Sequence, residues 1–187
     1  QDIQKMASAT IGNKVLKDQV NNFEKQSSDS KKNIQEKTKK AEFSEDQLRV
    51  ALKQEIGQGL AEVQREKDRV IVTVGSAGAF NSGSAKLTKK AREIMQKIAK
   101  VSAKGAGQVN VSGHTDDVPL IFGGQYRDNW DLAAARASSV VQELAKANTI
   151  PSNKLRAISF GETKPIEQND TKSGREKNRR IEIEIKY

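Results

Sequence analysis

The sequence RRIEIEIKY, Arg179 to Tyr187, closes the chain and decides its fold. Isoleucine occupies every second position from Ile181 to Ile185, and charged residues stand between the isoleucines. Side chains of a β-strand point alternately to the two faces of a sheet. The alternation therefore predicts a strand with one face packed on a core and the other face in water.

Upstream of this strand, segments of strand type and helix type alternate. Short β-branched segments predict strands at residues 69–74, 108–113 and 155–160. Apolar residues at helical spacing predict helices at residues 87–101 and 131–147. The glycine-rich segment 75–85 and the polar segment 161–178 predict loops. Strands that alternate with helices favour a two-layer α/β or α+β sandwich.

The residues before Arg69 are more polar than those after it. Residues 1–43 predict a polar helical or disordered linker, because residues 27–40 hold one large apolar side chain and bury too little surface to offset their ordering entropy. Residues 44–68 predict an amphipathic helix that begins at Ser44 as N-cap and is weakened by Gly57 and Gly59. Its apolar positions are Leu48, Leu52, Ile56, Leu60 and Val63. Residues 69–187 then form the compact domain.

Composition limits the classes of partner and of chemistry. The 187 residues include 33 Lys+Arg against 24 Asp+Glu, so an anionic partner is expected: nucleic acid, a membrane surface or a cell-wall polymer. Two tyrosines and one tryptophan offer little stacking for bases, which disfavours nucleic acid. The absence of cysteine excludes disulfides and thiol chemistry. No apolar run reaches the ~20 residues of a membrane span, and the chain opens with Gln1, so we expect a soluble piece of a longer protein.

The sequence VSGHTDDVP, residues 111–119, holds the only histidine, followed by two carboxylates. One histidine is too few for a usual transition-metal site. Ser112, His114 and Asp116 lie too close together on one segment to form a catalytic triad. The glycine-rich loop resembles a phosphate loop, but Ser84 stands where that loop needs lysine. We therefore expect no enzymatic activity, no metal and no cofactor.

Arg136 is the polar residue that most needs a partner. It interrupts an apolar line of Leu132, Val140 and Leu144 on the second predicted helix, and an unpaired buried guanidinium is very costly. Either Arg136 forms an ion pair with Asp116 that only locks the loop to the helix, or the two residues bind a zwitterionic amino acid. In the second case Asp116 takes the ammonium group and Arg136 takes the carboxylate in a bidentate fork.

Four motifs carry a family resemblance in the region from Val70 to Tyr187: GHTDD, NWDLAAARASSVV, FGETKP and GREKNRRIEIEI. In order and spacing they resemble the OmpA-like peptidoglycan-binding domain, which is shared by the OmpA C-terminal region, Pal lipoproteins and flagellar stator B subunits. The resemblance implies an α+β fold, a two-layer βαβαβ sandwich with a mixed sheet. It also implies that the ligand is the diaminopimelate of the peptidoglycan peptide stem.

The resemblance assigns binding roles residue by residue. The aspartate of the family falls on Asp116, its helix arginine on Arg136 and its pocket asparagine on Asn129. Backbone amides around Thr115 and Asp117 are expected to contact the ligand, and Asn178 with Arg179 is expected to flank the site. Many members have serine where this chain has Ala133, so one hydroxyl contact is missing.

The chain resembles the MotB and PomB stator subunits in three features: the stretch TDDVP, the glycine-containing insert after it and the NW pair. The lysine-rich and glutamine-rich N-terminal part favours the sodium-type PomB. This subfamily implies the periplasmic region of an inner-membrane single-pass protein at the flagellar basal body. Its partners would be peptidoglycan, a stator A subunit of the PomA/MotA type and a second copy in a homodimer, with no nucleic acid. A general envelope anchor of the OmpA or Pal type is the alternative.

Overall fold

The computed structural model describes residues 2–81, 83–121 and 124–187, with side chains of the first helix described from Asn13 onward. The chain divides into two units, residues 1–37 and 38–187, which are described separately. Helix α1 (Asp2–Ala51) supplies the whole described part of the first unit. The described side chains of that part are nearly all exposed to solvent. No helix among the described residues is long and apolar enough to span a membrane.

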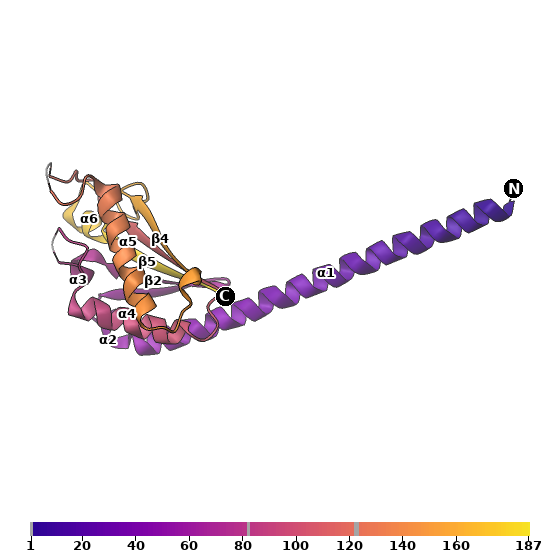
Figure 1. The fold of residues 1–187 in the computed structure, drawn as a ribbon, viewed down its shortest axis with the longest axis horizontal. Coiled ribbons are helices and arrows are strands. Elements are labelled where there is room, and N and C mark those ends of the chain that lie inside the picture. Colours follow the sequence, from indigo (N-terminus) through magenta and orange to yellow (C-terminus); the bar gives the residue numbers. More distant parts are fainter. Residues whose placement is uncertain (1, 82, 122–123) are drawn as a thin grey trace. The chain divides into compact units, whose positions relative to one another are not determined.

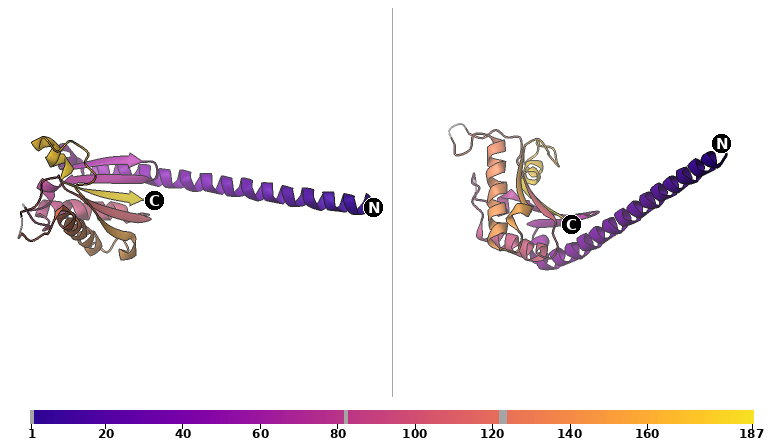
Figure 2. Two further views of the ribbon diagram at one scale, coloured as in Figure 1. Left: turned by 90° about the horizontal axis from the view of Figure 1, so that it is seen from above. Right: turned by 45° about the vertical axis from the view of Figure 1, so that its right-hand side comes forward.

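The second unit contains a five-stranded sheet and a layer of helices. In spatial order the strands are β1 (Ala61–Glu66), β2 (Arg69–Gly75), β5 (Arg180–Lys186), β3 (Gln108–His114) and β4 (Leu155–Gly161). All neighbours are antiparallel except β3 and β4. Helices α4 (Lys89–Ser102) and α5 (Asn129–Lys146) lie on the same side of the sheet (Figures 1 and 2). The predicted two-layer α+β sandwich with a mixed sheet is confirmed.

Strand β5, the stretch that closes the chain, is the central strand of the sheet. Ile183 pairs with Val72 of β2 on one side and with Val111 of β3 on the other. All three of its isoleucines are fully buried in the core cluster. On the opposite face, Glu184 accepts hydrogen bonds from Arg69 at 2.7 Å and from Asn110 at 2.8 Å. The predicted alternation of a packed face and a polar face is therefore correct.

The predicted helix at residues 44–68 is wrong beyond its first part. Helix α1 ends at Ala51, and α2 (Lys53–Gly57) is followed by Gly59 with φ of +70°, a conformation that favours glycine. Strand β1 then pairs with β2 in a hairpin, so Val63 is buried by period-two alternation and not by helical spacing. Ladder pairing with β2 overrides the local helical pattern. The predicted division into domains stays a prediction.

Three local predictions also differ from the structure. Ser44 is not an N-cap: it lies within α1, is buried, and its Oγ accepts a hydrogen bond from the hydroxyl of Tyr187. The glycine-rich loop contains the short helix α3 (Ser76–Ala79). The polar segment before β5 contains α6 (Lys172–Asn178), whose N-cap Thr171 accepts from the amide of Gly174 at 3.0 Å. A 3₁₀ turn (Ser152–Lys154) precedes β4.

Glu55 fixes α2 to α4 and is only 1% exposed. One of its carboxylate oxygens contacts Lys90 Nζ at 3.1 Å and Lys97 Nζ at 2.9 Å. Burial alone would raise the pKa of the Glu55 carboxyl, but the hydrogen bonds from the two lysines outweigh burial and lower this pKa to about 2. The charged form of Glu55 therefore stabilises the packing of α2 against α4 within the second unit.

We expect Glu55→Gln to lower the free energy of unfolding at pH 7 by roughly 2–3 kcal/mol. The unfolded chain takes up this proton near pH 4.5 and the folded chain only near pH 2, so the wild type loses the contribution as pH falls between these values. Urea unfolding of both proteins at pH 7 and at pH 3 measures the effect. The difference between them should shrink at pH 3, and an equal difference at both values would contradict the lowered pKa.

Candidate functional site

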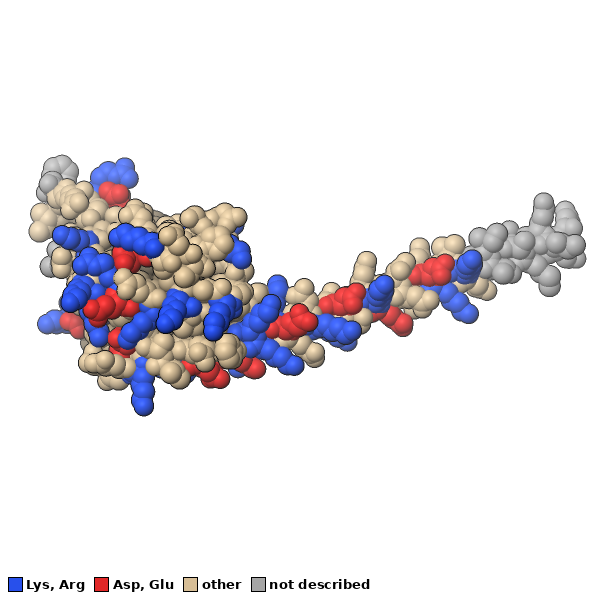
Figure 3. Space-filling view, turned by 60° about the horizontal axis from the view of Figure 1, so that its bottom comes forward, with Lys and Arg blue, Asp and Glu red and all other residues tan. Residues whose placement is uncertain are grey.

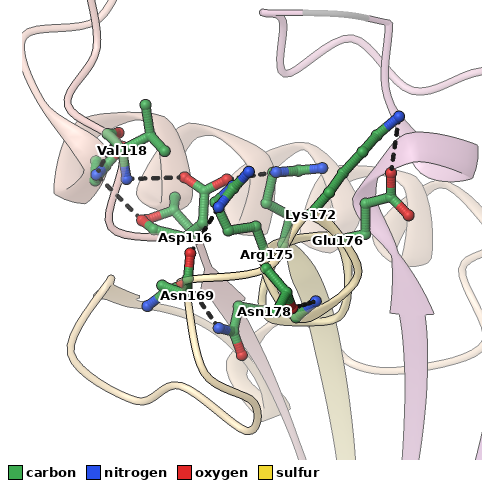
Figure 4. A network of polar contacts seen from close by, with 12 residues as sticks. Asp116, Val118, Asn169, Lys172, Arg175, Glu176 and Asn178 are labelled. Carbon is green, nitrogen blue, oxygen red and sulfur yellow. Dashed lines mark hydrogen bonds and ion pairs between the residues drawn. The ribbon is translucent and has the colours of Figure 1, made fainter.

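Asp116 lies in the turn that follows β3, and it is buried with 7% of its surface exposed. Its Oδ1 accepts a hydrogen bond from the amide of Val118 at 3.1 Å (Figure 4). Its Oδ2 forms an ion pair with Nη1 of Arg179, the residue directly before β5. The backbone of Thr115 is tied to β4 through its amide, which donates to the carbonyl of Gly161 at 2.9 Å. The carboxylate is therefore held by two contacts, and the backbone of the turn that carries it is held by a third.

Asn129, the first residue of α5, secures this turn from the helix side. Its Nδ2 donates to the carbonyl of Asp116 at 3.3 Å and to that of Val118 at 3.1 Å. The hydroxyl of Thr115 donates to the same Asp116 carbonyl at 2.8 Å. Asp117, by contrast, is exposed. Asn129 and Thr115 thus shape the turn around the carboxylate, and Asp117 lies at its surface.

Arg136 reaches the site from the middle of α5 and is 7% exposed. Its Nε donates to the carbonyl of Ser84 at 3.0 Å, and its guanidinium carbon lies 5.0 Å from the centroid of the Phe80 ring. Burial lowers the pKa of Arg136, Tyr126 raises it, and the charge of Arg179 lowers it further. An arginine remains protonated at neutral pH in spite of such a shift. The residue is therefore a fixed buried cation.

The structure does not pair Arg136 with Asp116. Among the described residues, the ion-pair partner of Asp116 is Arg179, and Arg136 has no carboxylate within ion-pair distance. Among the described residues its only hydrogen bond uses Nε, so neither terminal nitrogen has a hydrogen-bond partner there. An Arg136–Asp116 bridge that only locks the loop to the helix is thus not formed. The two terminal nitrogens form the planar fork that matches a carboxylate.

A pocket of about 390 Å³ is lined in part by Arg136. The other lining residues include Arg179, Ser76, Phe80 and Asn81. The Ser76 hydroxyl is buried and has no hydrogen-bond partner among the described residues. Two cations and one unsatisfied hydroxyl in one pocket can bind an anionic group. Asp116 does not line this pocket, but its carboxylate forms an ion pair with the lining residue Arg179 and is an acceptor for an ammonium group.

Asn178 supports the site without facing the pocket. Its Oδ1 accepts from the amides of Ile166 and Glu167 at 2.8 and 2.9 Å, and its Nδ2 donates to the carbonyl of Glu167 and to Asn169 Oδ1, each at 2.8 Å. Figure 4 shows its side chain directed to Asn169. These four bonds use its whole hydrogen-bonding capacity. Asn178 therefore holds the loop before α6 in place, and it is the last residue of α6, directly before Arg179.

The single histidine of the chain, His114, is the last residue of β3, next to this site, and is 3% exposed. Its ring stacks on Phe160 with 5.3 Å between centroids, and neither ring nitrogen has a hydrogen-bond partner among the described residues. Burial lowers the pKa of His114 to about 4, Arg180 and Lys164 lower it as well, and Glu182 opposes them. His114 is therefore neutral at pH 7, and no cluster of three or more ligating side chains forms around it in the described chain.

We expect the stability of the wild type to fall between pH 6.5 and pH 4 because of His114. The unfolded imidazole binds a proton near pH 6.5 but the folded one only near pH 4, so protonation favours the unfolded chain in this window. The loss is on the order of 1–3 kcal/mol. Urea unfolding across the window measures it, with His114→Phe as the comparison because it keeps the stacked ring. An equally steep pH dependence in His114→Phe would assign the effect to other groups.

Two parts of this site are not evident from the sequence. Phe80 and Ser84, which hold the guanidinium of Arg136, belong to a segment whose glycines and serines indicate only a flexible connector. The ion pair of Asp116 with Arg179 joins residues 63 positions apart, and no local pattern specifies such a pair. The one feature of the sequence that could have indicated a fixed loop is Phe80, the single aromatic residue of the glycine-rich segment. In the structure Phe80 is 3% exposed.

Comparisons with known proteins show the family to which the chain belongs. A model of the OmpA family matches residues 79–179. The chain is 33% identical over 194 residues to the uncharacterized protein YtxE of Bacillus subtilis (strain 168), covering 99% of the chain and 77% of YtxE. It is 29% identical over 125 residues to motility protein B of the same organism, covering 66% of the chain but only 48% of that relative. The chain belongs to the OmpA family.

Two solved structures are similar to this chain at 30% identity. The periplasmic domain of Helicobacter pylori MotB superposes with a TM-score of 0.59 at 30% identity, covering 67% of this chain and 78% of that one. The cell wall anchor of the type VI secretion system (T6SS) from Pseudomonas aeruginosa superposes with a TM-score of 0.67 at 30% identity, covering 74% of this chain and 96% of that one. The second unit is thus an OmpA-like domain with MotB-like relatives.

Proposed function

We propose that this chain is the peptidoglycan-binding region of a flagellar motor stator B subunit, which anchors an ion-driven torque-generating unit to the cell wall. Membership of the OmpA family and likeness to MotB and to a cell wall anchor support this proposal. The observation that carries it is the buried guanidinium of Arg136, whose two terminal nitrogens have no protein partner among the described residues and which lines a pocket of about 390 Å³. A buried cation without a counter-ion indicates an anionic ligand.

The proposed ligand is the diaminopimelate of the peptidoglycan peptide stem. Its D-centre keeps a free ammonium group and a free carboxylate when the rest of the residue is linked in the peptide. The carboxylate would take the Arg136 fork, with Arg179 and the Ser76 hydroxyl beside it. The ammonium group would share the carboxylate of Asp116 with Arg179. Thr115 and Asn129 hold the turn, exposed Asp117 contributes its backbone, and Asn178 supports Arg179.

The remaining parts of the proposal concern the whole stator subunit. We place this chain in the periplasm, as part of an inner-membrane protein at the flagellar basal body that works as a homodimer with a PomA/MotA-type A subunit. H. pylori MotB, whose periplasmic domain it resembles, supports the location. The sodium-type assignment rests on the lysine-rich and glutamine-rich lead of the sequence.

Competition for purified sacculi tests the ligand. We expect the chain to sediment with sacculi, and a stem tripeptide with diaminopimelate at its third position to release it. A tripeptide with lysine there keeps the ammonium group but lacks the carboxylate, and it should not compete at the same concentration. Equal competition by both peptides would reject a carboxylate-reading site, and failure to sediment would reject wall binding as a whole.

A further inference from the structure

A second concave surface lies in the second unit, away from the residues of the candidate site. It is a groove of about 590 Å³ between the last turns of α1 and the C-terminal half of α4. Its apolar floor includes Phe43, Val50 and Val101. Its rim carries five lysines and no carboxylate: Lys39, Lys40, Lys97, Lys100 and Lys104. We call this surface the lysine groove.

The floor of the lysine groove is a second apolar stripe of α1. The first stripe, with Ala41 and Leu48, is fully buried in the core. Phe43 and Val50 are seven positions apart, hence on one side of the helix, and are 57% and 74% exposed. Both are large apolar side chains that the fold leaves in solvent. The core does not bury this stripe, so it is available for contact with another molecule.

The positive charge of the rim is largely uncompensated, because four of its five lysines have no carboxylate partner among the described ion pairs. Lys97 is the one groove lysine with a carboxylate partner among the described ion pairs, the Glu55 carboxylate at 2.9 Å. The charges of Lys39, Lys40, Lys100 and Lys104 therefore face the groove and solvent. Figure 3 shows lysine and arginine side chains gathered on the face that carries the last turns of α1. The combination of an apolar floor and a basic rim requires a partner with both an apolar and an acidic part.

We propose that the lysine groove binds an acidic amphipathic helix of a partner protein. The groove lies between two helices, which is the usual seat of such a helix, with apolar side chains inserted into the floor. Residues 39–51 of α1 extend over about 18 Å, which matches roughly three turns of a bound helix. Acidic side chains flanking the apolar face would meet the lysines. The partner is thus a helix with leucine-like residues at spacings of three and four and with Asp or Glu beside them.

Two other occupants fit the groove less well. The groove is concave, whereas a bilayer presents a flat surface that cannot fill it. A simple polyanion would satisfy the lysines but leave the exposed faces of Phe43 and Val50 in water. The helix is the occupant that uses both features. This inference concerns a surface separate from the proposed peptidoglycan site and does not depend on it.

Binding of a synthetic peptide to the full chain tests the proposal. The probe is a fluorescent helix of about four turns with leucines on one face and glutamates on the flanks, followed by anisotropy at low and at physiological salt. We expect saturable binding that is about tenfold weaker in the triple variant Lys39→Gln/Lys100→Gln/Lys104→Gln. Phe43→Ser should weaken it by a similar factor. The matched control Lys67→Gln/Lys146→Gln/Lys172→Gln removes the same charge elsewhere and should change binding less than about twofold.

Three further probes define the results that would overturn the proposal. A peptide in which serine replaces each leucine should not bind, and equal binding would show a site for polyanions only. Vesicles rich in phosphatidylglycerol should bind more weakly than the leucine peptide, and the reverse order would indicate a membrane surface. Sedimentation of the chain alone should be unchanged by Phe43→Ser, and a loss of self-association would assign the groove to a second copy. Absence of peptide binding in the wild type also rejects the helix.

Discussion

Arg136→Met is expected to abolish binding to sacculi while leaving the fold as stable as the wild type. The substitution keeps a long apolar side chain over Phe80 but removes the fork that meets the ligand carboxylate. Loss of this bidentate charged contact is expected to lower the affinity for sacculi about 100-fold. The free energy of unfolding should stay within about 1 kcal/mol of the wild type or rise, because a buried charge without a counter-ion is replaced by an apolar group. Pull-down isotherms and urea unfolding measure the two quantities.

The pair of results separates a binding role from a structural one. If Arg136 served mainly to hold the loop of Ser84 in place, Arg136→Met would lose stability and wall binding together. The matched control is Arg156→Met, which removes an exposed arginine from the edge strand β4 and should affect neither quantity. Full binding by a folded Arg136→Met protein would remove this residue from the site.

Gly113→Ala is expected to lower the free energy of unfolding by about 3 kcal/mol or more. A Cβ at Gly113 would lie 2.2 Å from the carbonyl oxygen of Ala133 and 2.8 Å from its carbonyl carbon. These atoms belong to the backbone of α5 and cannot rotate away, so the helix must move from the sheet. Urea unfolding gives the stability, and a pull-down under native conditions should show weakened binding, because the shift displaces Asn129 and Arg136 relative to the turn at Asp116.

Gly75→Ala is the control for this close approach. A Cβ at Gly75 meets nothing within 4 Å, so this substitution should change stability by less than about 0.5 kcal/mol. Equal effects of the two substitutions would mean that loss of glycine in itself, and not the contact with Ala133, determines the cost. A stable Gly113→Ala protein with full binding would mean that α5 need not approach β3 so closely.

The fold could be predicted largely because its central parts carry periodic patterns. The alternation around Ile183 fixes both faces of β5, and the helical spacing of α4 and α5 fixes which sides are packed. The hairpin of β1 and β2 could not be predicted, because apolar residues at Leu60 and Val63 also fit a helix. Only pairing with β2, a contact within the folded sheet, decides between the two.

The residues of the candidate site could be predicted from the sequence better than the contacts between them. Arg136 could be singled out because a charge interrupted an apolar line, and its lack of a carboxylate partner follows only from the structure. The ion pair of Asp116 belongs to Arg179, which reaches the turn because β5 lies beside β3. Asn178 was predicted to flank the site, but all four of its hydrogen bonds go to residues of the loop before α6, Asn169 among them. Such assignments depend on side-chain direction, which spacing does not specify.

The most direct measurement of the central claim is the NMR signal of the arginine Nε–Hε groups during titration with the diaminopimelate tripeptide. We predict that the Arg136 and Arg179 signals shift together and saturate with the same affinity as competition for sacculi. The signal of Arg180, whose guanidinium is held by Glu182 at 2.7 Å and by two backbone carbonyls, should stay unchanged. Saturable binding with no change at Arg136 would contradict the proposed site, whatever the affinity.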